Sequence, residues 1–91
     1  MMTLPTVHLN GTSVESLLEQ NEHVLHSLYT TLEAMSLAAP HGRDYYPQGN
    51  EALGSAIEEH KTRVDLIQGL LVAYRAQRAH LLAEQDKRQR S

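Results

Sequence analysis

The residues best suited to bind a ligand lie in one short segment, RDYYPQG at positions 43–49. Tyr45 and Tyr46 offer large aromatic faces, which can stack on a nucleobase or pack on a protein at little cost in conformational entropy. Arg43 can hold a phosphate or a carboxylate through two parallel hydrogen bonds. We therefore expect this segment to bind a small anionic ligand. The alternative is that the two tyrosines only cover the end of a helical hairpin and that Arg43 pairs with Asp44.

Residues that could complete such a site lie elsewhere in the chain. Asn10 and Thr12, in the sequence HLNGTS, could hydrogen-bond to the ligand, and Lys61 or Arg63 could join Arg43 at its phosphate. In an antiparallel hairpin, Asn10 and Thr12 lie at the opposite end from the tyrosine segment. These groups can then converge only between subunits, in a site that is repeated at each interface.

Neither catalysis nor metal binding has a clear sequence motif. The chain has no cysteine, no glycine-rich phosphate-binding loop and neither of the motifs G-x-S-x-G and H-E-x-x-H. Four side chains on one side of the predicted first helix could hold Zn²⁺ or Ni²⁺ between subunits, but a solvated helix face explains them more simply: Glu19, Glu22, His23 and His26. We therefore expect a protein that is not an enzyme and has no catalytic residue, cofactor or metal site.

The first of the elements that position these residues is a helix predicted over residues 12–38. Its apolar residues recur every three or four positions in a broad stripe, which is typical of a helix in a bundle. Thr12 and Glu15 predict a capping box at its start. Asn21 interrupts the stripe, and a buried Asn at such a position can fix the register or the oligomeric state.

A loop over residues 39–50 leads to a second helix, predicted over residues 51–86 with Asn50 as its N-cap. An uninterrupted heptad pattern runs through most of this helix, with His60 on its seam. This position is compatible with a buried neutral histidine and equally with one that contacts a ligand or a second subunit.

Two glycines lie inside the second predicted helix, Gly54 and Gly69, and each costs about 1 kcal/mol relative to alanine. They could mark close contacts between helices. Outside the two helices, residues 1–11 are predicted to be extended and residues 87–91 to be a frayed tail.

The predicted fold is all-α: a single domain formed by an antiparallel helical hairpin with a longer second helix. At 1.5 Å per residue the helices span roughly 38 Å and 54 Å, which leaves about ten residues of the second helix without a partner. This overhang carries Leu81 and Leu82, and the N-terminal residues could fold back to cover part of it. The more economical expectation is that copies of the hairpin cover it in a homo-oligomeric helix bundle. The residues predicted at the interface between copies are Asn21, His60, Tyr74, Arg78, Leu81 and Leu82.

Charge and hydropathy limit the possible partners. The net charge of −3 gives no general reason to expect nucleic-acid binding, and no stretch approaches the roughly 20 apolar residues of a membrane span. The N-terminal stretch MMTLPTVHLNGTS lacks the basic and apolar regions of a signal peptide, so we expect a cytoplasmic protein. The predicted first helix is acidic and the end of the chain is basic, either because both are solvated or because they meet between subunits.

Three segments in this order, HLNGTS, APHGRDYYPQG and EEHKTR, resemble a group of small phage and prophage proteins over about residues 7–71. This resemblance implies expression in the cytoplasm of an infected bacterium. In architecture alone, the expected fold is similar to that of phage anti-defence sponges, which sequester cyclic oligonucleotides or related immune signals in pockets between subunits. No sponge motif can be carried over to individual residues of this chain.

The leading hypothesis is therefore a non-catalytic homo-oligomer that sequesters a cyclic nucleotide or another small anionic nucleotide at its subunit interfaces. The alternative is a protein-interaction module that inhibits a host protein or assists phage assembly, with the tyrosine segment or the basic end of the chain as its contact. Binding to a nucleic acid is the weakest hypothesis, because the first predicted helix is acidic.

Overall fold

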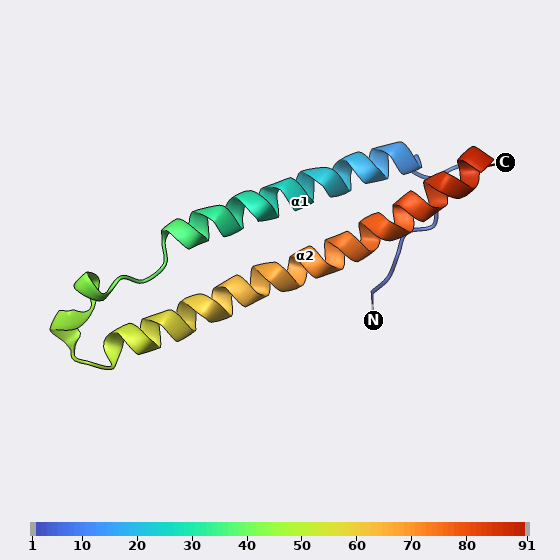
Figure 1. Ribbon diagram of the computed structural model, residues 1–91. Helices are drawn as coiled ribbons and strands as arrows, with labels where there is room; N and C mark the ends of the chain where they lie inside the picture. The colour runs from blue at the N-terminus through green and yellow to red at the C-terminus, as the bar shows by residue number, and fades with distance from the viewer. Residues whose placement is uncertain (1, 91) are drawn as a thin grey trace.

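Two long helices, α1 over Val14–Leu37 and α2 over Ala52–Arg90, run antiparallel in the computed structural model, which describes residues 2–90 (Figure 1). The loop between them contains two short 3-10 helices, η1 over Gly42–Asp44 and η2 over Tyr46–Gln48. No strand occurs among residues 2–90. In the same described range, no helix carries an apolar stretch long enough to cross a bilayer. The predicted all-α hairpin with a longer second helix is confirmed.

The N-terminus of α1 is capped by Ser13, whose hydroxyl accepts a hydrogen bond of 3.1 Å from the backbone N–H of Ser16. The predicted capping box of Thr12 and Glu15 is therefore wrong by one residue. With Ser13 as the cap, the position that should return a carboxylate to the cap is occupied by Ser16, which has none. The Ser13 hydroxyl still satisfies one of the free N–H groups of the first turn.

The second helix begins and ends slightly later than predicted. The backbone carbonyl of Glu51 accepts the first helical hydrogen bond, from the N–H of Ser55 at 3.1 Å, so Glu51 rather than Asn50 holds the N-cap position. The predicted frayed tail is helical up to Arg90, and its last residue, Ser91, lies outside the described residues. Basic side chains in the last turn favour this extension, because they lie at the negative end of the helix dipole: Lys87, Arg88 and Arg90.

The two helices pack along the stripes that their sequences predict. Most buried residues of α1 and α2 lie where the helices face each other or the N-terminal residues: Val14, Asn21, Leu25, Leu71 and Leu81. Ala56 is buried in the first turns of α2, on the part of the helix nearest the loop. Most other seam residues are only half-buried, because two helices alone cannot enclose a side chain from every direction. The core formed within one chain is accordingly thin.

The part of α2 without a helical partner lies mainly at the loop end rather than at the C-terminus (Figure 1). The Asn21 side-chain amide donates a hydrogen bond of 2.9 Å to the carbonyl oxygen of Tyr74, which places Tyr74 beside the N-terminal half of α1. Leu81, about two turns further along α2, lines a hollow together with Leu17 of α1. The overhang expected at Leu81 and Leu82 is therefore wrong. The reason is the long loop, whose η2 contacts α2 and spans its first turns.

Residues 2–10, called the N-terminal segment below, run along the C-terminal part of α2 (Figure 1). The Nε2 atom of His80 lies 2.8 Å from the carbonyl oxygen of Pro5, and the Arg88 guanidinium donates a hydrogen bond of 2.7 Å to the carbonyl oxygen of Val7. Together with α1, the segment covers Leu81, which is 1% exposed. A surface that we expected a second subunit to cover is thus filled from within the chain.

The hairpin is long and thin, with extents of 65 × 24 × 20 Å and a Cα radius of gyration of 19.4 Å. A compact domain of this length has a radius of gyration of about 12 Å. The chain exposes 6984 Å² of surface, whereas a compact monomer of its mass, 10.2 kDa, exposes about 5,300 Å². The extra surface, about 1,700 Å², is available for contacts with other molecules.

Candidate functional site

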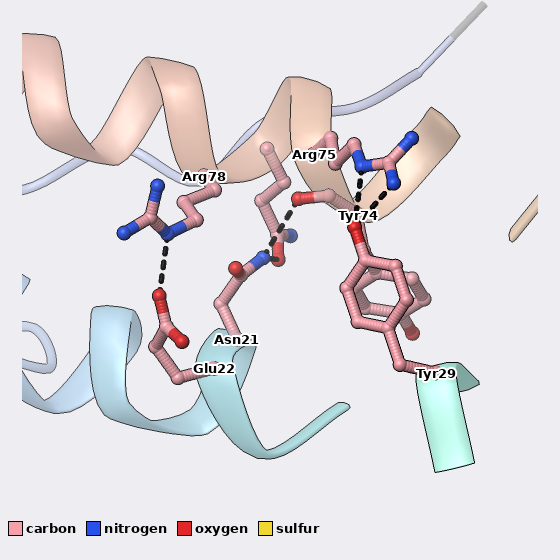
Figure 2. A network of polar contacts seen from close by, with 7 residues as sticks. Asn21, Glu22, Tyr29, Tyr74, Arg75 and Arg78 are labelled. Carbon is pink, nitrogen blue, oxygen red and sulfur yellow. Dashed lines mark hydrogen bonds and ion pairs between the residues drawn. The ribbon is translucent and has the colours of Figure 1, made fainter. Parts of the chain in front are cut away.

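A cluster of cationic and aromatic side chains lies on one side of the hairpin, where α1 and α2 face each other across an open hollow of about 460 Å³. We call it the Arg–Tyr cluster and define it by five residues: Glu22, His26, Tyr29, Arg75 and Arg78. The first three come from α1 and the two arginines from α2. Figure 2 shows that Arg75 reaches across to Tyr29 and that Arg78 reaches across to Glu22.

The register that creates this cluster is set by Asn21, which is 2% exposed. Its Nδ2 atom donates to the Tyr74 carbonyl oxygen at 2.9 Å (Figure 2). The same atom donates to Oε1 of Gln77 at 3.1 Å. Glu22 directly follows Asn21 and Arg78 directly follows Gln77. The contact between Asn21 and Gln77 therefore places Glu22 opposite Arg78. The polar bond inside the seam therefore positions the charged groups beside it.

Arg78 is held by an ion pair. Its Nε atom lies 2.5 Å from Oε1 of Glu22, and both side chains are partly exposed. Because water screens such a pair, it contributes at most about 1 kcal/mol to stability. Its main effect is to fix the direction of the guanidinium, whose other nitrogens make no hydrogen bond to the described residues.

Arg75 is held by an aromatic side chain instead of a carboxylate. Its Nε atom donates a hydrogen bond of 2.9 Å to the Tyr29 hydroxyl oxygen, and its Nη2 atom donates to the same oxygen. The guanidinium carbon lies 5.3 Å from the centroid of the Tyr29 ring, within the range of a cation–π interaction. Within residues 2–90, Arg75 has no carboxylate partner, so its charge is not neutralised.

The chemistry of the Arg–Tyr cluster is that of an anion site. Two guanidinium groups and one carboxylate border the hollow, so a net positive charge remains for a phosphate or a carboxylate. Tyr29 adds an aromatic ring and a hydroxyl at the same place. Among residues 2–90, no group of three or more His, Cys, Asp and Glu side chains could hold a metal ion. Glu22, one of the four residues considered as metal ligands from the sequence, pairs with Arg78 instead.

The loop residues expected to bind a ligand lie far from this cluster, at one end of the molecule (Figure 1). Tyr46 is 77% exposed, Tyr45 is half-buried and Arg43 is exposed. Arg43 forms no ion pair with Asp44 in the described structure. The segment is thus an exposed tip, and it borders a hollow lined by Gly42, Tyr46, Gly49, Asn50 and Leu53.

The other expected ligand-binding residues are dispersed. Asn10 and Thr12 are exposed and shortly precede α1, whose start lies at the opposite end of the hairpin from the loop (Figure 1), as we expected. Lys61 and Arg63 are exposed on α2, and Arg63 lies 4.0 Å from a carboxylate oxygen of Glu59. One chain therefore does not bring these groups together with the tyrosine segment.

Several residues expected at an interface between copies make contacts inside the chain. Asn21 and Tyr74 are joined by a hydrogen bond, Arg78 pairs with Glu22, and Leu81 is buried. His60 is half-buried on the seam of α2. Leu82 is exposed and remains available for a partner.

The pairing of Tyr29 with Arg75 could not be seen in the sequence. Tyr29 lies beside the apolar stripe of α1, and Arg75 directly follows a seam residue of α2, so both could be placed next to the seam. Their pairing depends on the register between the helices, and the bond from Asn21 to Tyr74 is the contact that reveals it. Comparison with models of protein families, with curated proteins and with solved structures finds no match to this chain.

Proposed function

We propose that the protein is a non-catalytic binding protein that captures a small anionic ligand of the nucleotide type at the Arg–Tyr cluster. The observation that carries the proposal is the state of Arg75, a cation held against an aromatic ring without a carboxylate partner among the described residues. Arg75 and Arg78 would bind phosphate oxygens, and Tyr29 would stack on the base or hydrogen-bond to the sugar.

The size and position of the hollow support this proposal. Its volume of about 460 Å³ lies within the range of about 300–1,000 Å³ that small-molecule sites occupy. The hollow is open to one side, so a second copy of the chain would enclose the ligand more fully.

A phage origin, which the resemblance of three sequence segments implies, would give this binding a biological role. A phage protein that captures a nucleotide-derived immune signal would protect the phage by lowering the free concentration of that signal in the host. Such a sponge needs no catalytic group, which agrees with the ligand-binding character of the cluster. It would work in the bacterial cytoplasm, where the signal is made.

Calorimetric titration with cyclic dinucleotides, cyclic trinucleotides and ADP-ribose isomers tests the proposal. We expect at least one of these ligands to bind, and Arg75→Gln to weaken that binding at least about tenfold, because a charge-assisted hydrogen bond contributes about 1.5–3 kcal/mol. Arg43→Gln is the matched control, since it removes the same charge from the exposed tip. Absence of binding across the panel would contradict the function, and a larger loss in Arg43→Gln would move the site to the tip.

The exposed tip favours a second candidate function, a protein-interaction module. Leu37 is 88% exposed and Tyr46 extends the same end of the hairpin, and exposed aromatic anchors of this kind often dominate protein interfaces. A photo-crosslinking residue at position 46 in infected cells should then capture one host or phage protein. Position 9, where Leu9 is 97% exposed, is the control, and equal capture at both positions would count against this candidate.

A further inference from the structure

The middle of α2 carries apolar residues on nearly every side. Residues 66–74, LIQGLLVAY, contain no charged residue. Ile67, Leu71 and Tyr74 lie on the side of α1, but Leu66 is 68% exposed and Val72 is 65% exposed. A helix that is apolar all round is normally covered on all sides. The outer face of α2, defined here as Leu66, Gly69, Leu70, Val72 and Ala76, lacks such a cover within the described chain.

Gly69 lies at the centre of this outer face. A Cβ atom added at Gly69 would meet no atom within 4 Å, so no neighbour within the chain requires a glycine there. Glycine lowers the stability of a helix interior relative to alanine. What the missing side chain does offer is a close approach for another backbone. The surface beside Gly69 therefore suits a second helix.

The exposed surface of the chain is large enough for contact with a second helix. The chain exposes about 1,700 Å² more than a compact monomer of equal mass. A standard interface covers about 800 Å² on each partner. The excess is thus large enough for a helix-sized contact, and a small molecule could cover only a minor part of it.

The distribution of charge along α2 indicates that the second helix is another copy of α2. Around its start, acidic residues outnumber basic ones: Glu51, Glu58, Glu59 and Asp65 against Lys61 and Arg63. In its last part, beyond the two arginines that contact α1, the balance is reversed, with Lys87, Arg88 and Arg90 against Glu84 and Asp86. A second α2 in the antiparallel direction places acidic halves beside basic halves on both sides of the apolar middle. A parallel second α2 would place like charges together.

We propose that a second copy of this chain packs its α2 antiparallel against the outer face of α2, around a two-fold axis close to Gly69. Such an interface is self-complementary, because each copy presents the same face to the other. The charged ends set the direction, and the exposed leucines and Val72 are buried at the centre. The interface does not use the Arg–Tyr cluster, whose arginines contact side chains of α1, so assembly and ligand binding can be tested separately.

Light scattering coupled to size exclusion tests the assembly. The wild-type protein should have a mass of at least twice 10.2 kDa, and Val72→Lys should shift it to the monomer. Leu37→Lys is the matched control, because Leu37 is at least as exposed but lies at the end of α1, and it should leave the mass unchanged. A wild-type monomer at micromolar concentration, or a Val72→Lys variant with the wild-type mass, would overturn the proposal.

The antiparallel direction is tested by cross-linking, which is simple in a chain without cysteine. Gly69→Cys should be joined to its copy by a short bis-maleimide, because the axis passes nearby. Gly54→Cys should not, since two-fold symmetry separates the two copies of position 54 by about 45 Å. Circular dichroism confirms that both variants remain helical. Efficient cross-linking at both positions would indicate parallel helices, and cross-linking at neither would contradict the contact.

Discussion

Replacement of Asn21 by aspartate is expected to destabilise the hairpin strongly although the two side chains have nearly the same shape. The Asn21 Nδ2 atom donates to two oxygens, the Tyr74 carbonyl at 2.9 Å and Gln77 Oε1 at 3.1 Å. In Asn21→Asp, an acceptor faces these two acceptors in a position that is 2% exposed. Two hydrogen bonds of about 1 kcal/mol each are lost. The new carboxylate is left without a donor in this buried position, which costs about 1–3 kcal/mol more, so we expect the free energy of unfolding to fall by about 3–5 kcal/mol.

Replacement of Asn21 by leucine should have a much smaller effect on stability. The Oδ1 atom of Asn21 is buried and has no hydrogen-bond partner in the described structure. Leucine removes this unpaired acceptor together with the two hydrogen bonds of Nδ2, and it adds apolar contacts in the seam. The gains and losses are each about 1–3 kcal/mol, so they nearly cancel. The variant should still lose the contact that sets the register, and with it the alignment of the Arg–Tyr cluster.

Urea unfolding followed by circular dichroism measures both effects at neutral pH. All variants must be compared at one protein concentration, because self-association would add to the apparent stability. Glu22→Gln is the control: it breaks a partly exposed ion pair and should change the stability by less than about 1 kcal/mol. The reasoning is refuted if Asn21→Asp is as stable as the wild type, or if Asn21→Leu is the less stable of the two.

Three further changes have expected outcomes. Ser13→Ala should lower the free energy of unfolding by about 1 kcal/mol because it removes the N-cap of α1, whereas Thr12→Ala should change it little. The midpoints of urea unfolding of the two variants test this difference. Deletion of the N-terminal segment, residues 2–10, should cost about 2–4 kcal/mol, since it exposes a buried leucine and removes two polar contacts, and an unchanged melting temperature would contradict this. Gly54→Ala should stabilise α2 by about 1 kcal/mol, because a Cβ there meets no atom within 4 Å, whereas Gly69→Ala, in the proposed interface, should show no such gain in thermal melting.

The helices could be predicted from local properties of the sequence. The stripe of α1 and the heptad of α2 depend on spacing alone, and the buried residues lie on them. Proline and glycine after Leu37 end α1 where expected. The capping residue was missed because Thr12 and Ser13 are both good N-caps, and only the backbone path between them and the first turn distinguishes one from the other.

The relative position of the helices could not be predicted in the same way. It depends on the path of the loop, whose η2 lies against the start of α2. A loop with fewer residues alongside α2 would have brought α1 beside the start of α2 and left Leu81 without α1 next to it. The predicted overhang was wrong for this reason, and the pairing of Arg75 with Tyr29 was missed because it depends on the same register.

The burial of Asn21 could be predicted from the sequence, but its hydrogen-bond partners could not. Its place on the stripe correctly indicated a buried polar residue. The sequence did not show whether its partner belongs to the same chain. In the structure its hydrogen-bond partners are Tyr74 and Gln77 of α2, in the same chain. These two hydrogen bonds explain why the charged side chains next to these residues face each other.

Ligand capture at the Arg–Tyr cluster is tested most directly by nuclear magnetic resonance with a bound cyclic dinucleotide as the probe. If the proposal is correct, the Nε–H signal of Arg75 and the ring signals of Tyr29 shift on titration, and the signals of residues 43–49 shift less. Arg75→Gln should abolish these shifts while the helical signals of α1 and α2 remain. Shifts confined to residues 43–49, or none with any nucleotide of the calorimetric panel, would contradict it.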